Sequence, residues 1–181
     1  FYSFMGNMEI GSNANTSYRA LFLNRHQAEY NTVFYDIWAY VDAGTQVILT
    51  VYADHGYGIA PTTILARTGI GSSVSAGWIR LPLNTPVQVT QGSTYWLGFI
   101  INSGRIYQST DEQLYARQNI PVFDEPPATF AGMTYSGGNV TSLYVSGCPG
   151  PTHTWTPTGT WATPTPTQTP TLTPTSSRTR T

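Results

Sequence analysis

The stretch "VFYDIWAYVDAGTQVILTVYA", residues 33–53, decides the fold. In its first half, one face is predicted to carry Val33, Tyr35, Ile37, Ala39 and Val41. The opposite face is predicted to carry Phe34, Asp36, Trp38 and Tyr40. In its second half, one face is predicted to carry Val47, Leu49, Val51 and Ala53. The other face is predicted to carry Gln46, Ile48, Thr50 and Tyr52. A period of two residues indicates β-strands, because successive side chains of a strand point to opposite faces.

The same period recurs along most of the chain. Further strands are expected at residues 18–23, 63–67, 77–83, 86–90, 94–101, 128–135 and 140–146. β-branched and aromatic residues fill these segments, and clusters of Gly, Pro, Asn and Ser separate them. No segment shows a sustained helical period. The pattern predicts an all-β fold, an antiparallel β-sandwich of the jelly-roll type.

Residues 1–10 form a candidate strand with a role in assembly. Its apolar face is predicted to carry Tyr2, Phe4, Met8 and Ile10. A strand at a chain end either completes its own sheet or acts as a donor strand for a neighbouring copy. Donation from copy to copy is head-to-tail, and a head-to-tail contact that does not close gives a filament. The sequence leaves both alternatives open.

The chain divides into a β-sandwich domain, residues 1–148, and a Thr/Pro-rich tail, residues 149–181. Proline restricts its own φ and biases the preceding residue toward extended geometry, so we expect a polyproline-II-like tail. That helix has three residues per turn, so threonines two apart project in three directions. O-linked sugars on them would surround the backbone, as in mucin-like stalks. The candidate O-glycosylation sites are Thr163, Thr165, Thr167, Thr169, Thr171, Thr173 and Thr175.

Four further residues are candidates for assembly or modification. Trp155 and Trp161 lie in the tail, where we expect them to dock on a sandwich surface, either their own or that of the next copy. Asn15 and Asn139 each begin an Asn-x-Ser/Thr sequon and are the candidate N-glycosylation sites.

The composition is poor in charge. Charged residues make up 9% of the 181 residues, lysine is absent and the formal net charge is -1. Three interpretations fit such a surface: it is buried in an assembly, it is covered by glycan, or it is a Ser/Thr/Asn-rich surface of a secreted protein. Eight scattered arginines form no basic patch, so no nucleic-acid partner is expected, and no apolar run is long enough to predict a membrane span.

Cys148, the single cysteine, can form no disulfide within the chain. The first residue, Phe1, is consistent with the removal of a secretion signal.

The histidines and acidic residues do not match a known catalytic or metal-binding motif. His26, His55 and His153 are far apart and fit no metal or nucleophile motif. The acidic pairs Asp111-Glu112 and Asp124-Glu125 could bind calcium, but they lack the spacing of a calcium loop. We therefore expect no catalytic residues, no metal and no cofactor other than covalent glycans.

Two segments carry a family resemblance. The stretches "VYADHGYGIAPTTILARTG", residues 51–69, and "SAGWIRLPLNTPVQVTQGSTYWLGF", residues 75–99, resemble a β-sandwich module that recurs in secreted bacterial proteins. The stretch "MGNMEIGSNANTSYRALFL" fits its opening strands, so the resemblance covers residues 5–102. The segment "APTTILAR" departs from the family pattern, which has Gly after the proline. The resemblance implies a surface-exposed sandwich placed beside Thr-Pro-rich linkers, and implies no activity.

Two functional hypotheses follow. The first is a secreted, non-enzymatic structural subunit of a glycosylated extracellular or cell-surface fibre, with copies of itself and glycans as partners. The alternative is a carbohydrate-binding module tethered by an O-glycosylated linker. In that alternative, Trp38, Tyr40 and Tyr52 are the candidate stacking residues, because a flat ring complements the C–H face of a pyranose.

Overall fold

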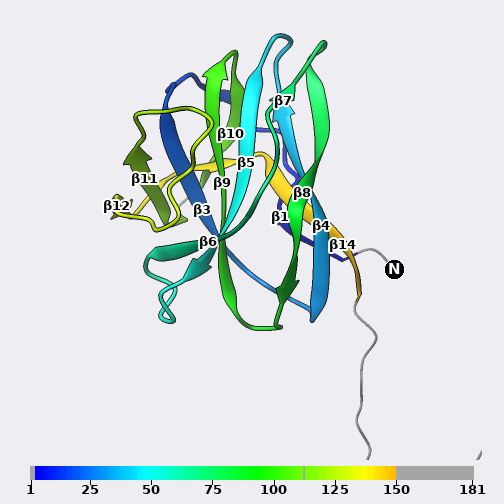
Figure 1. Ribbon diagram of the computed structural model, residues 1–181, viewed down its shortest axis with the longest axis vertical. Helices are drawn as coiled ribbons and strands as arrows, with labels where there is room; N and C mark the ends of the chain where they lie inside the picture. Colours follow the sequence, from blue (N-terminus) through cyan, green and yellow to red (C-terminus); the bar gives the residue numbers. More distant parts are fainter. Residues whose placement is uncertain (1–2, 112, 150–181) are drawn as a thin grey trace, which may run out of the picture.

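The computed structural model describes residues 3–111 and 113–149, and these residues form two antiparallel β-sheets packed face to face (Figure 1). No helix occurs in this part of the chain. The predicted antiparallel all-β sandwich is therefore confirmed. Strands β3, β4 and β5 alternate between the two sheets, and so do β8, β9, β10 and β11.

Each sheet has seven strands, and we name the sheets A and B. Sheet A contains β1 (Ser3–Asn7), β2 (Asn13–Asn15), β4 (Thr32–Val41), β8 (Gly77–Val89), β10 (Ile106–Asp111), β13 (Gly138–Thr141) and β14 (Leu143–Pro149). Sheet B contains β3 (Ala20–Gln27), β5 (Gln46–Asp54), β6 (Pro61–Arg67), β7 (Gly71–Ser72), β9 (Thr94–Ser103), β11 (Tyr115–Asn119) and β12 (Met133–Tyr135). The central strand of sheet A is β4, which lies between β14 and β8.

The main core lies between the sheets. From sheet A it receives Ile37, Ala39 and Val41, and from sheet B it receives Val47, Leu49 and Val51, as the alternation predicts. Phe22 and Phe99 stack within it, with ring centroids 5.3 Å apart. Burial of these apolar side chains is the main favourable contribution to folding.

A β-bulge changes the alternation at the start of β4. The register between β4 and β8 shifts between Phe34 and Asp36. Before the shift, Phe34 is buried in the core and Tyr35 is 49% exposed. The predicted faces are therefore correct from Ile37 onward and wrong for residues 33–35, because a bulge inserts one residue and exchanges the two faces.

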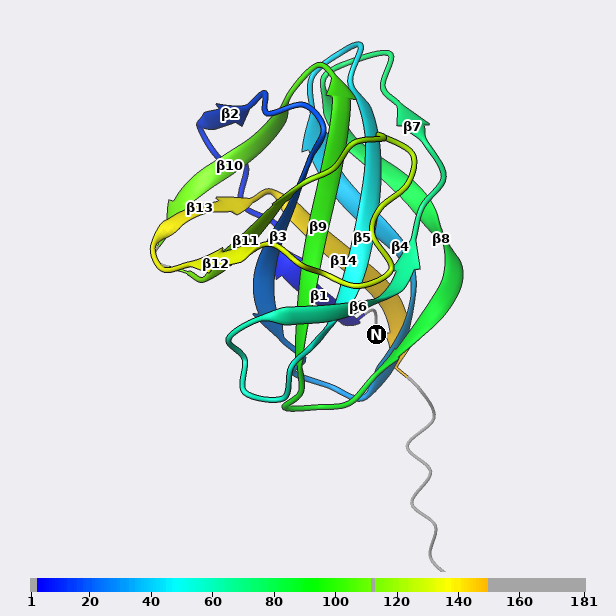
Figure 2. The same ribbon diagram turned by 60° about the vertical axis from the view of Figure 1, so that its left-hand side comes forward.

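Sheet B has a second core on its outer face. Tyr52, which alternates with the inward residues of β5, is fully buried there together with Trp96 and Ile100. The covering segment is the loop between β11 and β12, residues 120–132, which crosses in front of β9 and β5 in Figure 2 and contributes Ile120, Phe123 and Phe130 to this core. The Tyr52 hydroxyl donates a 2.6 Å hydrogen bond to the Pro127 carbonyl, and burial raises the pKa of Tyr52. The prediction that Tyr52 offers its ring to a sugar is wrong.

The N-terminal strand pairs within its own chain. Residues 3–7 of β1 pair with residues 143–147 of β14, which is the self-pairing alternative. Met5 is buried, whereas Met8 and Ile10 are 47% and 52% exposed beyond the end of the strand. The predicted strand face is therefore wrong for Met8 and Ile10, because β1 ends at Asn7.

Several predicted features lie outside the described residues. They are Tyr2, the side chains of Phe4 and Cys148, the indoles of Trp155 and Trp161, and the tail threonines from Thr163 to Thr175. Within the described part of the chain, no helix is long and apolar enough to cross a membrane.

A polar cluster ties the two sheets together at one side of the sandwich. Asn24 on β3 is buried, and its side-chain amide donates a 3.1 Å hydrogen bond to the Asn139 carbonyl. Its Oδ1 accepts hydrogen bonds from the Thr141 backbone N–H at 3.1 Å and from the Thr141 hydroxyl at 2.8 Å. One side chain of sheet B thus satisfies three polar groups of β13 in sheet A.

Candidate functional site

The outer face of sheet A carries a cluster of aromatic side chains from four adjacent strands. The inward positions of these strands are filled by core residues such as Ile37, Ala39, Ile106 and Val145. The residues that alternate with them point outward. We call this surface the aromatic face, and its rings are Trp38, Tyr40, Trp78, Tyr107 and Tyr144.

One row of the aromatic face runs from β14 across β4 to β8. Tyr144 pairs with Trp38, and Trp38 pairs with Arg80. The rings of Tyr144 and Trp38 are nearly parallel, with centroids 5.7 Å apart, and the Arg80 guanidinium carbon lies 5.8 Å from the Trp38 centroid. Because β14 and β8 flank β4 on opposite sides, Trp38 has a neighbour against each of its faces.

The second row contains Tyr107, Tyr40 and Trp78. Tyr40 contacts both other rings edge to face, at centroid distances of 5.6 Å to Trp78 and 5.4 Å to Tyr107. Trp78 also reaches across β4 to Tyr144, whose centroid is 5.1 Å away. In the described part of the chain, Trp78 has neither a parallel ring nor a cation over it. It is the ring of the cluster best placed to offer a face to a ligand.

Charged residues mark both ends of the aromatic face. Along β4 and just beyond it, the outward order is Asp36, Trp38, Tyr40 and Asp42. At about 3.3 Å per residue, the two carboxylates are ~20 Å apart along the strand direction. Asp36 forms a 2.6 Å ion pair with Arg80, and Asp42 lies 3.9 Å from Arg105. Each end of the face therefore presents a carboxylate and a guanidinium.

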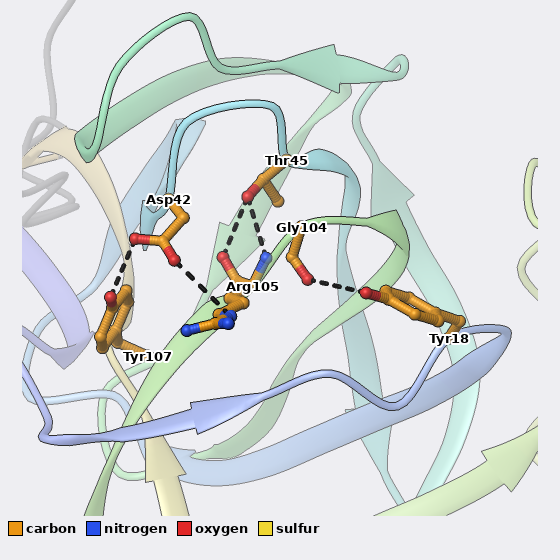
Figure 3. Close-up of polar contacts among 6 residues, drawn as sticks. All are labelled: Tyr18, Asp42, Thr45, Gly104, Arg105 and Tyr107. Carbon is orange, nitrogen blue, oxygen red and sulfur yellow. Dashed lines mark hydrogen bonds and ion pairs between the residues drawn. The ribbon is translucent and has the colours of Figure 1, made fainter.

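The corner at Asp42 is built from the ends of three strands (Figure 3). The Tyr107 hydroxyl donates a 2.8 Å hydrogen bond to Asp42 Oδ1, and this bond raises the pKa of Tyr107. The Thr45 hydroxyl accepts from the Arg105 backbone N–H at 3.0 Å and donates to the Arg105 carbonyl at 3.1 Å. Asp42 thus fixes the Tyr107 ring against Tyr40, while Thr45 fixes the backbone that carries Arg105.

The opposite side of this corner involves the segment that leads into β3. Tyr18 is half exposed, and its hydroxyl donates a 3.4 Å hydrogen bond to the Gly104 carbonyl (Figure 3). Gly104 has a φ of +78°, and a side chain there would collide with Thr45. The turn before β10 therefore requires glycine, because only glycine adopts this φ without strain and leaves the space for Thr45.

The aromatic face carries polar groups as well as rings. Its two carboxylates are each paired with an arginine, and its remaining polar groups are tyrosine hydroxyls and an indole N–H. Rings with flanking charged groups can hold a ligand that has apolar faces and polar edges. Among the described residues, no three His, Cys, Asp or Glu side chains lie close enough together to bind a metal.

The structure brings together two of the three predicted stacking residues. Trp38 and Tyr40 share the aromatic face, whereas Tyr52 is buried in the outer core of sheet B. The sequence reasoning missed Trp78, Tyr107 and Tyr144. A signal for two of them was present, since the alternation in residues 77–83 and 140–146 places Trp78 and Tyr144 opposite the apolar residues of those strands.

The two N-glycosylation sequons lie near each other, on either side of a small pocket of about 150 Å³. Asn15 is partly buried, and its amide donates a 3.2 Å hydrogen bond to Gln108. Asn139 is exposed on β13. A glycan on Asn15 would replace one hydrogen of the amide nitrogen that contacts Gln108, so Asn139 is the more accessible of the two.

No family model matches the chain, and no curated protein matches it. The aromatic face is therefore the feature from which a function has to be inferred.

Proposed function

We propose that this domain is a non-catalytic carbohydrate-binding module and that the aromatic face is its binding surface. The observation that carries the proposal is the gathering of five rings from four strands on one outer face, between two carboxylate–arginine pairs. Aromatic rings stack on the C–H faces of sugars, and carboxylates and guanidinium groups form hydrogen bonds with hydroxyls.

The dimensions of the aromatic face favour an extended glycan. The ~20 Å between Asp36 and Asp42 is several times the width of one sugar ring. The rings lie between these two carboxylates, so a glycan along β4 would meet apolar contacts at its centre and hydrogen-bonding groups at both ends. A single sugar would use only a fraction of this surface.

Trp78 and Tyr40 are the residues from which we expect the largest contribution. Both rings have only edge-to-face partners, whereas Trp38 lies between Tyr144 and Arg80. Asp42 and Tyr107 then orient the ligand at one end of the face.

The test is binding to a panel of neutral oligosaccharides, such as cello-, xylo- and manno-oligosaccharides, by glycan array and calorimetry. Replacement of Trp78 by alanine should weaken binding about tenfold or more, as expected for an anchoring aromatic side chain. Arg117→Gln is the matched control, because Arg117 lies outside the aromatic face and contacts the Phe22 ring. Unchanged affinity in Trp78→Ala and Tyr40→Ala, or no binding to any neutral glycan, would reject the proposal.

A fibre subunit is the second candidate function. β1 is a five-residue strand at the edge of sheet A, and the exposed Met8 and Ile10 follow it directly. A charge content of 9% also favours association. In this proposal residues 1–10 pair with a neighbouring copy, and the Thr/Pro-rich tail carries O-linked glycans outside the cell. The resemblance to secreted bacterial modules supports the extracellular setting for both candidates.

Electron microscopy of the purified native protein separates the two candidates. Fibres with a regular repeat favour assembly, and isolated particles favour a tethered binding module. Deletion of residues 1–10 then tests strand donation. A folded monomer that no longer polymerises supports donation, whereas loss of folding shows that β1 is needed by its own sheet.

A further inference from the structure

A second pocket, separate from the aromatic face, lies at the end of sheet B between the loop after β5 and the loop before β9. Its volume is about 630 Å³, and its wall includes Arg25, Gln27, Tyr57, Ser93 and Tyr95. The loop after β5 projects from the lower part of the molecule, beside the lower ends of β3 and β9 (Figure 2). We propose that this pocket binds an acidic sugar, a uronate residue of a polysaccharide.

The loop that forms one wall is held in a defined conformation. Asp54 Oδ2 accepts hydrogen bonds from the backbone N–H groups of Gly56 at 2.7 Å and Gly58 at 2.6 Å. Asp54 Oδ1 accepts from the Trp96 indole at 2.8 Å. Both glycines have positive φ, +103° and +68°, which disfavours any other residue at these positions. The loop therefore presents its exposed residues from a fixed backbone.

Arg25 supplies the positive charge of the pocket. Its Nη1 donates a 3.1 Å hydrogen bond to the Gly58 carbonyl, so the guanidinium is oriented by the same loop. In the part of the chain that the structure describes, the ion pairs involve Arg80 and Arg105, and no carboxylate lies within ion-pair distance of Arg25. An oriented guanidinium without a carboxylate partner favours a carboxylate from a ligand.

Tyr57 supplies a flat apolar surface at the mouth of the pocket. It is 80% exposed, and the His55 ring stacks beside it at an interplanar angle of 29°, with centroids 6.1 Å apart. An aromatic ring this exposed gains little for folding but can stack on a sugar ring. Gln27, Ser93 and Thr94 add hydrogen-bonding groups suited to hydroxyls.

Asp54 also lines this pocket, but its carboxylate does not lie beside the Arg25 guanidinium, where a ligand anion is expected to bind. Partial burial alone would raise the pKa of Asp54, but hydrogen bonds from Trp96, Gly58, Gly56 and His55 outweigh it and lower that pKa. The carboxylate is therefore ionised, and both oxygens face the loop amides and the indole. A ligand carboxylate is expected at Arg25, with its sugar ring toward Tyr57.

The ligand class follows from this combination of groups. A guanidinium binds anions, an exposed ring can stack on a flat apolar partner, and the amide and hydroxyl groups can bond to a polar edge. A uronate residue carries a carboxylate, an apolar C–H face and several hydroxyls on one ring. A neutral sugar would leave Arg25 without its partner.

The test is calorimetric titration of the full chain with short oligogalacturonates and glucuronate oligosaccharides. Neutral oligosaccharides of equal length are titrated in parallel. Arg25→Gln should weaken binding of the acidic probe about tenfold or more, as expected for loss of a charge-assisted hydrogen bond. Tyr57→Ala, on an exposed loop where folding is not at risk, should weaken it several-fold. Raising the salt concentration should lower the affinity of the wild-type chain for the acidic probe. The same increase in salt should lower the affinity of Arg25→Gln by a smaller factor.

Two controls separate this pocket from the aromatic face. Trp78→Ala should leave acidic-probe binding unchanged, and Arg117→Gln removes an equal charge elsewhere and should also leave it unchanged. Equal affinity of the Trp78→Ala variant for acidic and neutral probes, unchanged affinity in both Arg25→Gln and Tyr57→Ala, or no binding of either uronate would overturn the proposal. Loss of acidic-probe binding in Trp78→Ala would instead assign the uronate to the aromatic face.

Discussion

The outer faces of the two sheets have similar sequence patterns but differ in how deeply their side chains are buried. On β4, Trp38 and Tyr40 alternate with core residues and remain on the surface. On β5, Ile48 and Tyr52 alternate with core residues in the same way and are completely buried. For Tyr52, the difference lies in the loop between β11 and β12, residues 120–132, which covers the outer face of sheet B and accepts a hydrogen bond from the Tyr52 hydroxyl at the Pro127 carbonyl. An outward aromatic residue therefore becomes a surface residue or a core residue according to what covers it.

Truncation of Tyr52 tests the buried side of this comparison and should have the largest effect. Tyr52→Ala removes a fully buried ring and leaves a cavity, so the free energy of unfolding should fall by about 3–5 kcal/mol. Urea denaturation followed by fluorescence measures this change. Tyr52→Phe keeps the ring and loses only the hydrogen bond to Pro127, so its cost should be about 1 kcal/mol. Equal, small effects of both variants would show that the covering segment does not pack on sheet B.

A histidine on the inner face of sheet B should make stability depend on pH. Burial lowers the pKa of His26 to about 4, against an ordinary value of 6.5, and no hydrogen-bond partner of its Nε2 is found in the described residues. The unfolded chain therefore binds the proton more readily, so this stability is fully present above pH 6.5 and is lost as the pH falls toward 4. The loss should reach about 3 kcal/mol.

Denaturation curves between pH 4 and 7 check this prediction. His26→Gln supplies the control, because glutamine does not titrate in this range. The variant should have a flatter stability profile than the wild-type chain over the same interval. Identical slopes for the two proteins would contradict the assignment to His26.

Removal of the polar tie between the sheets should have an intermediate effect. Asn24→Ala leaves the buried N–H of Thr141 without its acceptor, which should cost about 2 kcal/mol. Asn13→Ala is the matched control, because Asn13 makes an exposed hydrogen bond to Thr110 on the same side of the sandwich. Urea denaturation should show a clear difference between the two variants, and similar small losses would mean that Asn24 does not join the sheets.

Truncation of Trp78 tests the exposed side and should have the smallest effect on stability. Trp78→Ala removes edge contacts with Tyr40 and Tyr144 on the surface, so the cost should be about 1 kcal/mol. The same variant is expected to lose glycan binding. Large loss of binding with little loss of stability is the opposite of the result expected for Tyr52. A destabilisation as large as that of Tyr52→Ala would place Trp78 among the structural residues.

Much of the fold could be predicted because it depends on local alternation. Ile37, Val47 and Leu49 point into the core as their positions in the sequence indicate. The faces of residues 33–35 could not be predicted, because the bulge depends on pairing with β8, more than 40 residues away. The apolar residues Met8 and Ile10 were misassigned for a similar reason, since the end of β1 is set by its pairing with β14.

The candidate sites were predictable only in part. Trp38 and Tyr40 could be nominated from one strand, but the cluster they belong to also takes Trp78, Tyr107 and Tyr144 from three other strands. The pocket at Arg25 required the approach of loops separated by more than 30 residues. No spacing rule within one segment identifies such neighbours.

The amino-acid pattern is sufficient to show that this chain forms strands, which side chains alternate along most of them, and that two layers enclose an apolar core. This is so because alternation is a property of neighbouring residues along one strand. Long-range contacts determine which outer face is covered, which aromatic rings meet and which arginines have a carboxylate partner within the described residues. Those outcomes depend on contacts between segments distant in the sequence, and the free energy of each contact depends on both partners.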